Sequence, residues 1–348
     1  MELVWLAIVA VMIAVYVVMD GFDIGAGILS CLLAKEDKEK RQILQSIGPV
    51  WDGNEVWLLA GGGVLYFAFP ALYASGFSGF YLPLMIVLWL LILRGISIEL
   101  RGHVDSPLWK PFWDNVFGGA SILLAIFFGA ALGNVVRGVP LESSGFFFLP
   151  LWTDFGFGPH GLSSPEGGFL DWYTILVGVL ALLTLTLHGA KWLIFKTAGS
   201  LQEKCLRIEG KLWIGVVLMV VIVTLATFSI QPQVMNNFKS APWGFIFPLL
   251  AVAGLAGMLV FRKAHQELKG FLASALYIVG MLTGAAFGIF PYVLPSSTNP
   301  ELALTVYSAK AADYGLWVGF LWWVPGMILV TIYFVYTYRM FSGKVEVE

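Results

Sequence analysis

Long apolar segments recur along the whole chain, and they predict an all-α membrane protein. Nine stretches are apolar and long enough to cross a bilayer. They lie near residues 3–33, 53–73, 76–99, 114–137, 169–193, 207–231, 243–261, 271–293 and 314–341. We expect a tight turn around Ala74 to Gly76 to separate the second stretch from the third. The pattern therefore predicts a polytopic fold with nine transmembrane helices.

The polar segments between these stretches predict how the chain is oriented. If the N-terminus lies outside, only Arg137, Lys239 and Lys310 of the 20 Lys and Arg residues fall on the outer side. Basic residues gather on the cytoplasmic side of membrane proteins. We therefore expect an outside N-terminus and a cytoplasmic C-terminus. The first stretch carries no basic region and no small-residue cleavage pattern, so we expect a first transmembrane helix there and no removed signal.

Composition supports the membrane assignment and excludes little else. Hydrophobic residues make up 59% of the chain and charged residues 12%, against about 25% charged residues in an average soluble domain. The net charge of −2 and the lack of a basic tract give no indication of nucleic-acid binding. The two cysteines, Cys31 and Cys205, predict no disulfide framework, and no metal-ligand cluster or nucleotide-binding motif occurs.

Acidic side chains between Asp20 and Trp57 are the most unusual polar feature. Asp20 and Asp23 are three residues apart, as are Asp52 and Glu55, so each pair would share one face of a helix. An ionised carboxylate near the bilayer centre costs about 2.5 to 3.5 kcal/mol. We therefore expect these acids to line a protonatable, partly wet seam that faces another subunit.

Asp23 and Asp52 are the strongest candidates for proton chemistry. Asp23 has no basic neighbour in its own helix, and burial would favour its neutral acid, which suits a group that takes up and releases a proton. The alternative for Asp23 is a structural hydrogen bond to a neighbouring helix. Asp52 lies at a cytoplasmic helix start, where the helix dipole would also favour a negative charge without any role in chemistry.

Arg94 and Glu99 lie near the inner end of the third stretch, five residues apart. This spacing is poor for a pair within one helix, so partners on other helices or on another chain are expected. Arg94 could pair with a carboxylate of the first or second stretch, or with a cofactor carboxylate across an interface. The alternative is that Arg94 extends to the cytoplasmic headgroups.

The histidines argue against a haem bound by this chain. Of the four histidines, only His188 would lie within a span, whereas His103 and His265 fall in cytoplasmic loops and His160 in the external loop. Ligation by two histidines needs side chains at matched depth on facing helices. That pattern is absent, so no cofactor is expected to bind here directly. The aromatic loop 138–168 is expected to pack as an external cap.

A series of motifs resembles subunit II of the cytochrome bd family of quinol oxidases. They are GFDIGAGIL, GPVWDGNEVWL, SGFYLPL, RGISIELRG, WKPFWDNVFGGAS, ALGNVVRGVP, HGAKW and FPYVLPSS, which follow in order over nearly the whole chain. The resemblance implies a heterodimer in the bacterial plasma membrane that oxidises quinol and reduces O2 to water. It implies that the b and d haems belong to the larger subunit I, and that this chain is haem-free.

The resemblance also implies an architecture and a set of site residues. It implies two four-helix bundles, about 1–137 and about 169–293, an external loop 138–168 and a peripheral ninth helix at about 314–341. By motif, Asp23 and Asp52 would belong to a proton route from the cytoplasm along the subunit interface. We add Glu55 and Glu99 to this route, and we assign a supporting role to the charges of Asp20, Arg94 and Arg101. Some members of the family hold a structural quinone or attach a small accessory subunit, and both remain open here.

Two other classes of function remain as alternatives. An ion- or proton-coupled transporter would also use acids at membrane depth and helices broken at glycines. It would predict inverted repeats, and the sequence contains no recognisable repeat. A pure assembly scaffold is the third possibility.

Overall fold

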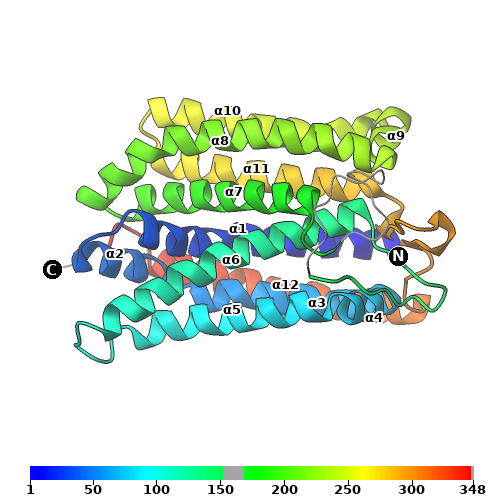
Figure 1. Ribbon diagram of the computed structural model, residues 1–348, viewed down its shortest axis with the longest axis horizontal. Helices are drawn as coiled ribbons and strands as arrows, with labels where there is room; N and C mark the ends of the chain where they lie inside the picture. Colours follow the sequence, from blue (N-terminus) through cyan, green and yellow to red (C-terminus); the bar gives the residue numbers. More distant parts are fainter. Residues whose placement is uncertain (152–167, 346–348) are drawn as a thin grey trace.

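The computed structural model describes residues 1–151 and 168–345, and its helices run side by side along the long axis of the molecule (Figure 1). The helices are α1 (Glu2–Leu32), α2 (Asp37–Ile47), α3 (Trp51–Ala68), α4 (Pro70–Gly79), α5 (Tyr81–Leu100), α6 (Trp109–Arg137), α7 (Trp172–Lys196), α8 (Ser200–Ile230), α9 (Pro232–Ser240), α10 (Ile246–Lys263), α11 (Glu267–Ile289) and α12 (Asp313–Met340). Short 3-10 turns η2 (Pro242–Phe245) and η3 (Pro300–Leu302) and strands β1 (Tyr292–Leu294) and β2 (Leu304–Thr305) complete the described fold. The two strands pair in antiparallel orientation.

Eight helices in the described part of the chain are long and apolar enough to span a membrane, which makes the protein a multi-pass membrane protein. They are α1, α5, α6, α7, α8, α10 with the preceding turn, α11 and α12. Helix α3 is 18 residues long and is not among them. It carries Asp52, Asn54, Glu55 and three consecutive glycines, which lower its hydropathy. Helices α3 and α4 together occupy the stretch in which the remaining span was expected.

The expected tight turn at Ala74 to Gly76 was wrong. These residues lie inside α4, and the helices break at Phe69 and at Phe80. Phe69 leaves the helical region with φ −134° and ψ 65° because the ring of Pro70 disfavours a helical conformation in the residue before it. Proline therefore sets the first break, whereas the small residues at 74–76 continue the helix.

Helix α1 lies at the centre of the molecule and is unbroken through Gly21. Its 31 residues span about 46 Å, longer than a hydrocarbon core of about 30 Å. It packs against α3, α6, α7 and α11. At its crossing with α7, a Cβ atom on Gly25 would lie 2.1 Å from the carbonyl oxygen of Leu185 and 2.8 Å from Cα of Gly189. The absence of side chains at this crossing lets the two backbones approach closely.

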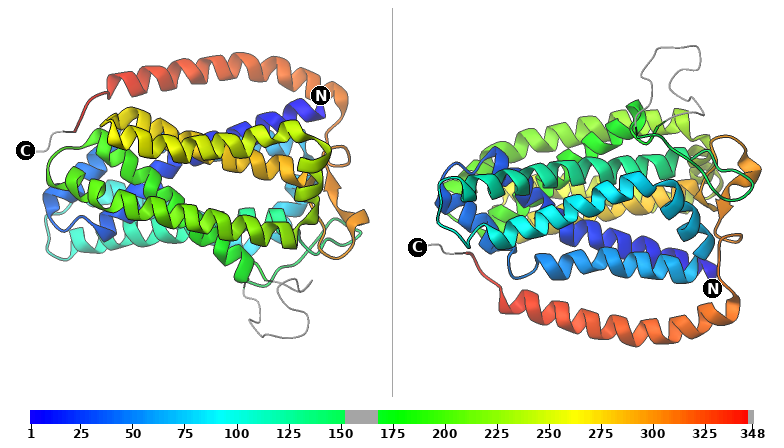
Figure 2. Two further views of the ribbon diagram at one scale, coloured as in Figure 1. Left: turned by 90° about the horizontal axis from the view of Figure 1, so that it is seen from above. Right: turned by 60° about the horizontal axis from the view of Figure 1, so that its bottom comes forward.

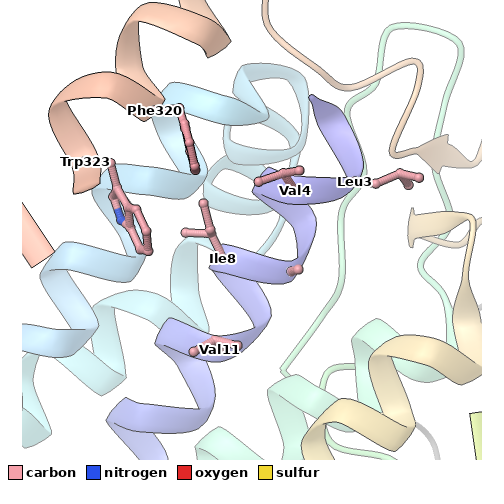
Figure 3. A pocket seen from close by; sticks show the side chains of 7 residues that line it. Leu3, Val4, Ile8, Val11, Phe320 and Trp323 are labelled. Atoms are coloured by element: carbon pink, nitrogen blue, oxygen red, sulfur yellow. The ribbon is translucent and has the colours of Figure 1, made fainter.

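Helix α12 runs along the edge of the molecule and is fastened near both ends (Figure 2). Near its N-terminal end, the indole nitrogen of Trp5 donates to the carbonyl oxygen of Leu316 at 3.1 Å. Beyond its C-terminal end, the amide of Val345 donates to the carbonyl oxygen of Lys196 at 2.7 Å. Between α1 and α12 lies an apolar pocket of about 460 Å³ (Figure 3), lined by Leu3, Val4, Ala7, Ile8, Val11, Phe320 and Trp323.

The described part of the loop after α6 packs onto the helix ends, as expected of a cap. Phe147 is fully buried, with its ring centroid 5.0 Å from that of Phe80. Phe169 packs 5.7 Å from Phe127 on α6. The loop acids and histidine at positions 154, 160 and 166 lie outside the described residues.

Candidate functional site

Arg94 of α5 is fully buried and joins three helices through two carboxylates. Its guanidinium donates to Asp20 of α1 at 2.8 Å and to Glu55 of α3 at 2.8 Å. The side chains of Asp20 and Arg94 are 0% exposed, whereas that of Glu55 is 23% exposed. The planar guanidinium suits this role because its separate N–H groups can serve two carboxylates at once. The prediction that Arg94 pairs with a carboxylate of the first or second stretch is confirmed for both stretches.

Asp23 lies one helical turn from Asp20 and has a different partner. The side-chain amide of Asn54 donates to Oδ2 of Asp23 at 2.8 Å. Asn54 in turn accepts a hydrogen bond at its Oδ1 from the hydroxyl of Tyr338 on α12, also at 2.8 Å. Asp23 and Asn54 are both buried, at 1% and 0% exposure. Among the described residues, the side chains that form this hydrogen-bonded chain with Asp23 are therefore uncharged, and no ion pair joins Asp23 to a basic side chain.

Three of the other predicted residues lie apart from this cluster. Asp52 is exposed in the first turn of α3, and Glu99 is exposed in the last turn of α5. Arg101 lies just beyond α5, where it pairs with Asp114 at 2.5 Å and with Asp37 at 2.8 Å. The structure thus brings Asp20, Asp23, Glu55 and Arg94 together, and it separates them from Asp52, Glu99 and Arg101.

Arg101 belongs to a second polar cluster, which includes residues of α2 and Asp114 in the second turn of α6. Lys40 joins Arg101 on Asp114 at 2.9 Å, so two cations share one largely buried carboxylate. The hydrogen bond from Arg101 holds the pKa of the Asp37 carboxyl below its ordinary value of 3.8. A shallow polar groove of about 540 Å³ runs over these residues. The pairing of cations with carboxylates accounts for this cluster as a link between α2, α5 and α6.

Comparison with known proteins bears directly on these clusters. The family described as "Cytochrome bd terminal oxidase subunit II" matches residues 1–341. The chain belongs to this family. It is a subunit of a terminal oxidase, an oxidoreductase complex of the bacterial plasma membrane, and the family implies a subunit I as partner.

Relatives match over nearly their whole length. The "Probable cytochrome oxidase subunit 2" of Haemophilus influenzae is 30% identical over 99% of this chain and 95% of the relative. The "Cytochrome bd ubiquinol oxidase subunit 2" of Bacillus subtilis is 32% identical over 90% of this chain and 87% of the relative. The "Cytochrome bd-I ubiquinol oxidase subunit 2" of Escherichia coli K12 is 29% identical over 100% and 96%.

A solved structure shares the fold. The bd oxidase from Geobacillus thermodenitrificans includes a chain that matches with a TM-score of 0.75 over 98% of both chains, at 16% identity. The helices described above therefore have the arrangement of a bd oxidase subunit.

The cytochrome bd family implies haems in the oxidase complex, and the histidines described here do not fit one. Among the described residues, His188 is the only histidine within a candidate span. Its ring nitrogens lie 2.7 Å from the Ser274 hydroxyl and 2.9 Å from the Val18 carbonyl oxygen. Iron ligation would have to break one of these contacts inside a fully packed site. No group of three metal-ligating side chains occurs in the described part of the chain either.

A further buried ion pair joins α7 and α8 of this bd oxidase subunit. Lys191 of α7 donates to Glu209 of α8 at 2.5 Å, and both side chains are about 5% exposed. Arg262 of α10 approaches the same carboxylate at 3.7 Å. Sequence reasoning missed this pair, because nothing in the spacing of α7 and α8 sets which residues face each other.

Asn54 and Tyr338 are the site residues that sequence reasoning missed. Asn54 lies between Asp52 and Glu55 in the WDGNEVW motif. Burying its uncharged amide costs less free energy than burying a charge, so the sequence did not mark it as unusual. Tyr338 is 284 positions away from Asn54, near the C-terminal end of α12, and tyrosines are common at the ends of membrane helices. Only the packing of α12 against α3 reveals its role.

Proposed function

We propose that this chain is the haem-free subunit II of a bd-type quinol:O2 oxidoreductase, and that its acids carry protons from the cytoplasm toward the haems of subunit I. One observation supports the proton role most strongly. Asp23 is buried without a cation, while the neighbouring Asp20 and Glu55 share Arg94. A buried carboxyl without a cation favours its neutral acid, and so Asp23 is the member of the cluster best suited to exchange a proton.

The arrangement of charges supports a division of labour within the cluster. The guanidinium of Arg94 contacts two carboxylates, and we assign its positive charge to compensate Asp20, which is fully buried against it. Glu55 shares the same guanidinium but keeps contact with the surface, so its proton can exchange with water. We therefore propose that protons pass between Glu55 and Asp23.

The remaining predicted residues fit the approach to this cluster. Asp52 is exposed one turn before Glu55 on α3, which supports a place at the cytoplasmic entrance. Glu99 is exposed on α5, one turn beyond Arg94 toward the same side, and we assign it a flanking role. We propose that Arg101, in its separate cluster, supports the route by fixing the inner end of α5.

Membership of the family supports the proposed quinol donor and the proposed haems of the partner subunit. The relatives named above include ubiquinol oxidase subunits, which supports quinol as the donor of the complex. The engaged ring nitrogens of His188 support haem b and haem d sites in subunit I and none here. We retain nine spans, two four-helix bundles, an outside N-terminus and a peripheral α12 as part of this proposal. A structural quinone and a small accessory subunit remain open additions to the complex.

An ion-coupled transporter is not favoured. The full-length match to an oxidase subunit family supports an oxidoreductase, and the sequence lacks inverted repeats.

Spectra of material purified through a tag on this chain test the proposal. We expect haem b and haem d bands that follow a larger co-purifying subunit, together with quinol oxidase activity. The chain expressed without that subunit should show neither. Haem that stays with the isolated chain, or transport by the isolated chain in liposomes, would refute the assignment.

A further inference from the structure

Tyr338 on the peripheral helix touches the proposed proton site from outside the two acid-bearing helices. We propose that Tyr338 is a positioning residue, whose hydroxyl holds the Asn54 amide in the orientation that serves Asp23. This inference rests on the proton relay proposed above.

The hydrogen bonds of Asn54 have a direction that Tyr338 fixes. An asparagine amide presents an acceptor at one end and a donor at the other. The hydroxyl of Tyr338 donates to Oδ1, so Nδ2 points at Asp23 and donates to it, both at 2.8 Å. A flipped amide would turn its oxygen toward the carboxylate oxygen, an unfavourable contact once Asp23 has lost its proton. Asn54 is 0% exposed, so water cannot replace either partner freely.

The surroundings of Asp23 leave Asn54 as its main support. Among the described residues, the charged or titratable groups around Asp23 are Asp20 on its own helix, Glu55 of α3 and Arg94 of α5, with Tyr338 of α12 joined to it through Asn54. Arg94 is the one cation among them, and it donates to Asp20 and Glu55. The negative form of Asp23 therefore depends on the N–H of Asn54 for a direct donor.

Tyr338 is itself held firmly in place. Its ring packs against Phe334 and against Trp192 of α7, each at a centroid distance of 6.3 Å. Three residues later, the carbonyl oxygen of Phe341 accepts from the side chain of Lys196 at 2.6 Å. The following tail is joined to α11 by an ion pair between Lys344 and Glu267 at 3.0 Å. The inner end of α12 is thus anchored to α7 and α11, which keeps the hydroxyl opposite Asn54.

Loss of the Tyr338 hydroxyl should make the ionised form of Asp23 less stable. The variant Tyr338→Phe keeps the ring contacts and removes the donor. In the intact oxidase we expect quinol oxidase turnover to fall about two- to tenfold, the range that corresponds to one hydrogen bond. The pH–rate profile should move to higher pH, by up to about one unit, because Asp23 would hold its proton more tightly. Haem content should stay unchanged, and the thermal unfolding midpoint should fall only slightly, because the buried Asn54 oxygen loses its donor.

Controls separate this role from a general effect. Tyr336→Phe removes a hydroxyl from a residue of the same helix that is 65% exposed, and it should leave turnover and the pH profile unchanged. Asn54→Leu, which removes the amide, should slow turnover at least as much as Tyr338→Phe. Combined with Asp23→Asn, the change at Tyr338 should add no further loss.

Three results distinguish the possible failures. If Asp23→Asn slows the enzyme while Tyr338→Phe leaves both rate and pH profile unchanged, the role of Tyr338 is refuted and the relay stands. If Tyr338→Phe lowers turnover only in proportion to lost haem, its role is structural and the inference is again overturned. If Asp23→Asn is itself without effect, the proposed relay fails first.

Discussion

At the scale of single residues, Arg94 shows how a charge can be kept inside the membrane part of the fold. A buried cation is tolerable when carboxylates satisfy it, but removal of one partner leaves the others uncompensated. Arg94 pairs with both Asp20 and Glu55, so its loss would leave these two carboxylates without their cation. The guanidinium therefore stabilises the contact of α1, α3 and α5.

Replacing Arg94 by glutamine should destabilise the subunit strongly. Breaking a buried ion pair costs about 3 to 5 kcal/mol, so we expect a clear fall in the thermal unfolding midpoint of the purified complex. The matched control is Arg207→Gln, because Arg207 is 72% exposed and lies 3.7 Å from Glu203. Such surface pairs contribute about 0 to 1 kcal/mol. Equal midpoints for the two variants would contradict the role of Arg94.

Glu39 links helix α2 to helix α8 through contacts that depend on pH. Burial raises the pKa of its carboxyl, but hydrogen bonds from Lys204 at 2.5 Å and Ser200 at 2.9 Å outweigh burial, and the pKa lies below the ordinary value of 4.5. A lowered pKa in the folded state gives stability that is complete above the ordinary value. This stability is lost as the pH falls through the lowered pKa.

We expect α2 to loosen in acid. Hydrogen exchange over residues 37–47, corrected for intrinsic rates, should accelerate as the pH falls below about 4.5, the ordinary value from which the pKa of Glu39 is lowered. Glu39→Gln should exchange faster already at neutral pH and should lose most of the acid dependence. Glu203→Gln, at a glutamate 70% exposed, serves as the control. Protection of α2 that does not change over this range would count against the Glu39 link.

Residue spacing predicted part of this site and missed the rest. The five-residue gap between Arg94 and Glu99 correctly excluded an intrahelical pair and pointed to carboxylates on other helices. It could not choose between them, and the structure uses two. Asn54 and Tyr338 escaped notice because neither carries a charge whose burial demands an explanation.

At the scale of helices, the crossing of α1 and α7 depends on two glycines. A Cβ atom on Gly189 would lie 2.4 Å from the backbone carbon of Gly25. A backbone atom cannot give way as a flexible side chain can. The small residues therefore set the distance between the helix that carries Asp23 and the helix that carries His188.

Gly25→Ala should force these helices apart. Overpacking in a well-packed core costs about 1 to 3 kcal/mol, so we expect a lower unfolding midpoint and a lower yield of complex. The matched control is Gly119→Ala in α6, where no atom lies within 4 Å of the added Cβ. That variant should be neutral or slightly stabilising, because alanine favours a helix by about 1 kcal/mol over glycine. A Gly25 variant as stable as the Gly119 variant would show that the crossing tolerates a wider spacing.

Helix boundaries were predictable where they depended on hydrophobic length. Length and apolarity predicted the spans that became α1, α5 to α8 and α10 to α12. Length and apolarity wrongly placed a helix break at residues 74–76. The helix breaks instead at Phe69, because Pro70 restricts the backbone of the residue before it. The same two criteria also treated the stretch of α3 as an ordinary span, although its polar first turn and glycines make it the least apolar of the set.

At the scale of the whole molecule, the site is assembled from segments far apart in the chain. α1 brings two acids, α3 brings Glu55 and Asn54, α5 brings Arg94, and α12 returns along the edge to add Tyr338 (Figure 2). Sequence could predict which residues were unusual in a membrane, because burial of a charge is costly wherever it occurs. It could not predict which of them meet, since that depends on how the helices pack.

The measurement that tests the account most directly is proton uptake by the reconstituted oxidase with Asp23→Asn. The fully reduced complex in liposomes is mixed with O2, and uptake from the cytoplasmic side is followed together with the haem spectra. We expect normal haem content and a proton uptake slowed by at least about tenfold, since asparagine keeps the size of the side chain but cannot carry a proton. Asp105→Asn, at an aspartate 94% exposed, should match the unmodified enzyme. Uptake at the normal rate in the Asp23 variant, with its haems intact, would contradict the central claim.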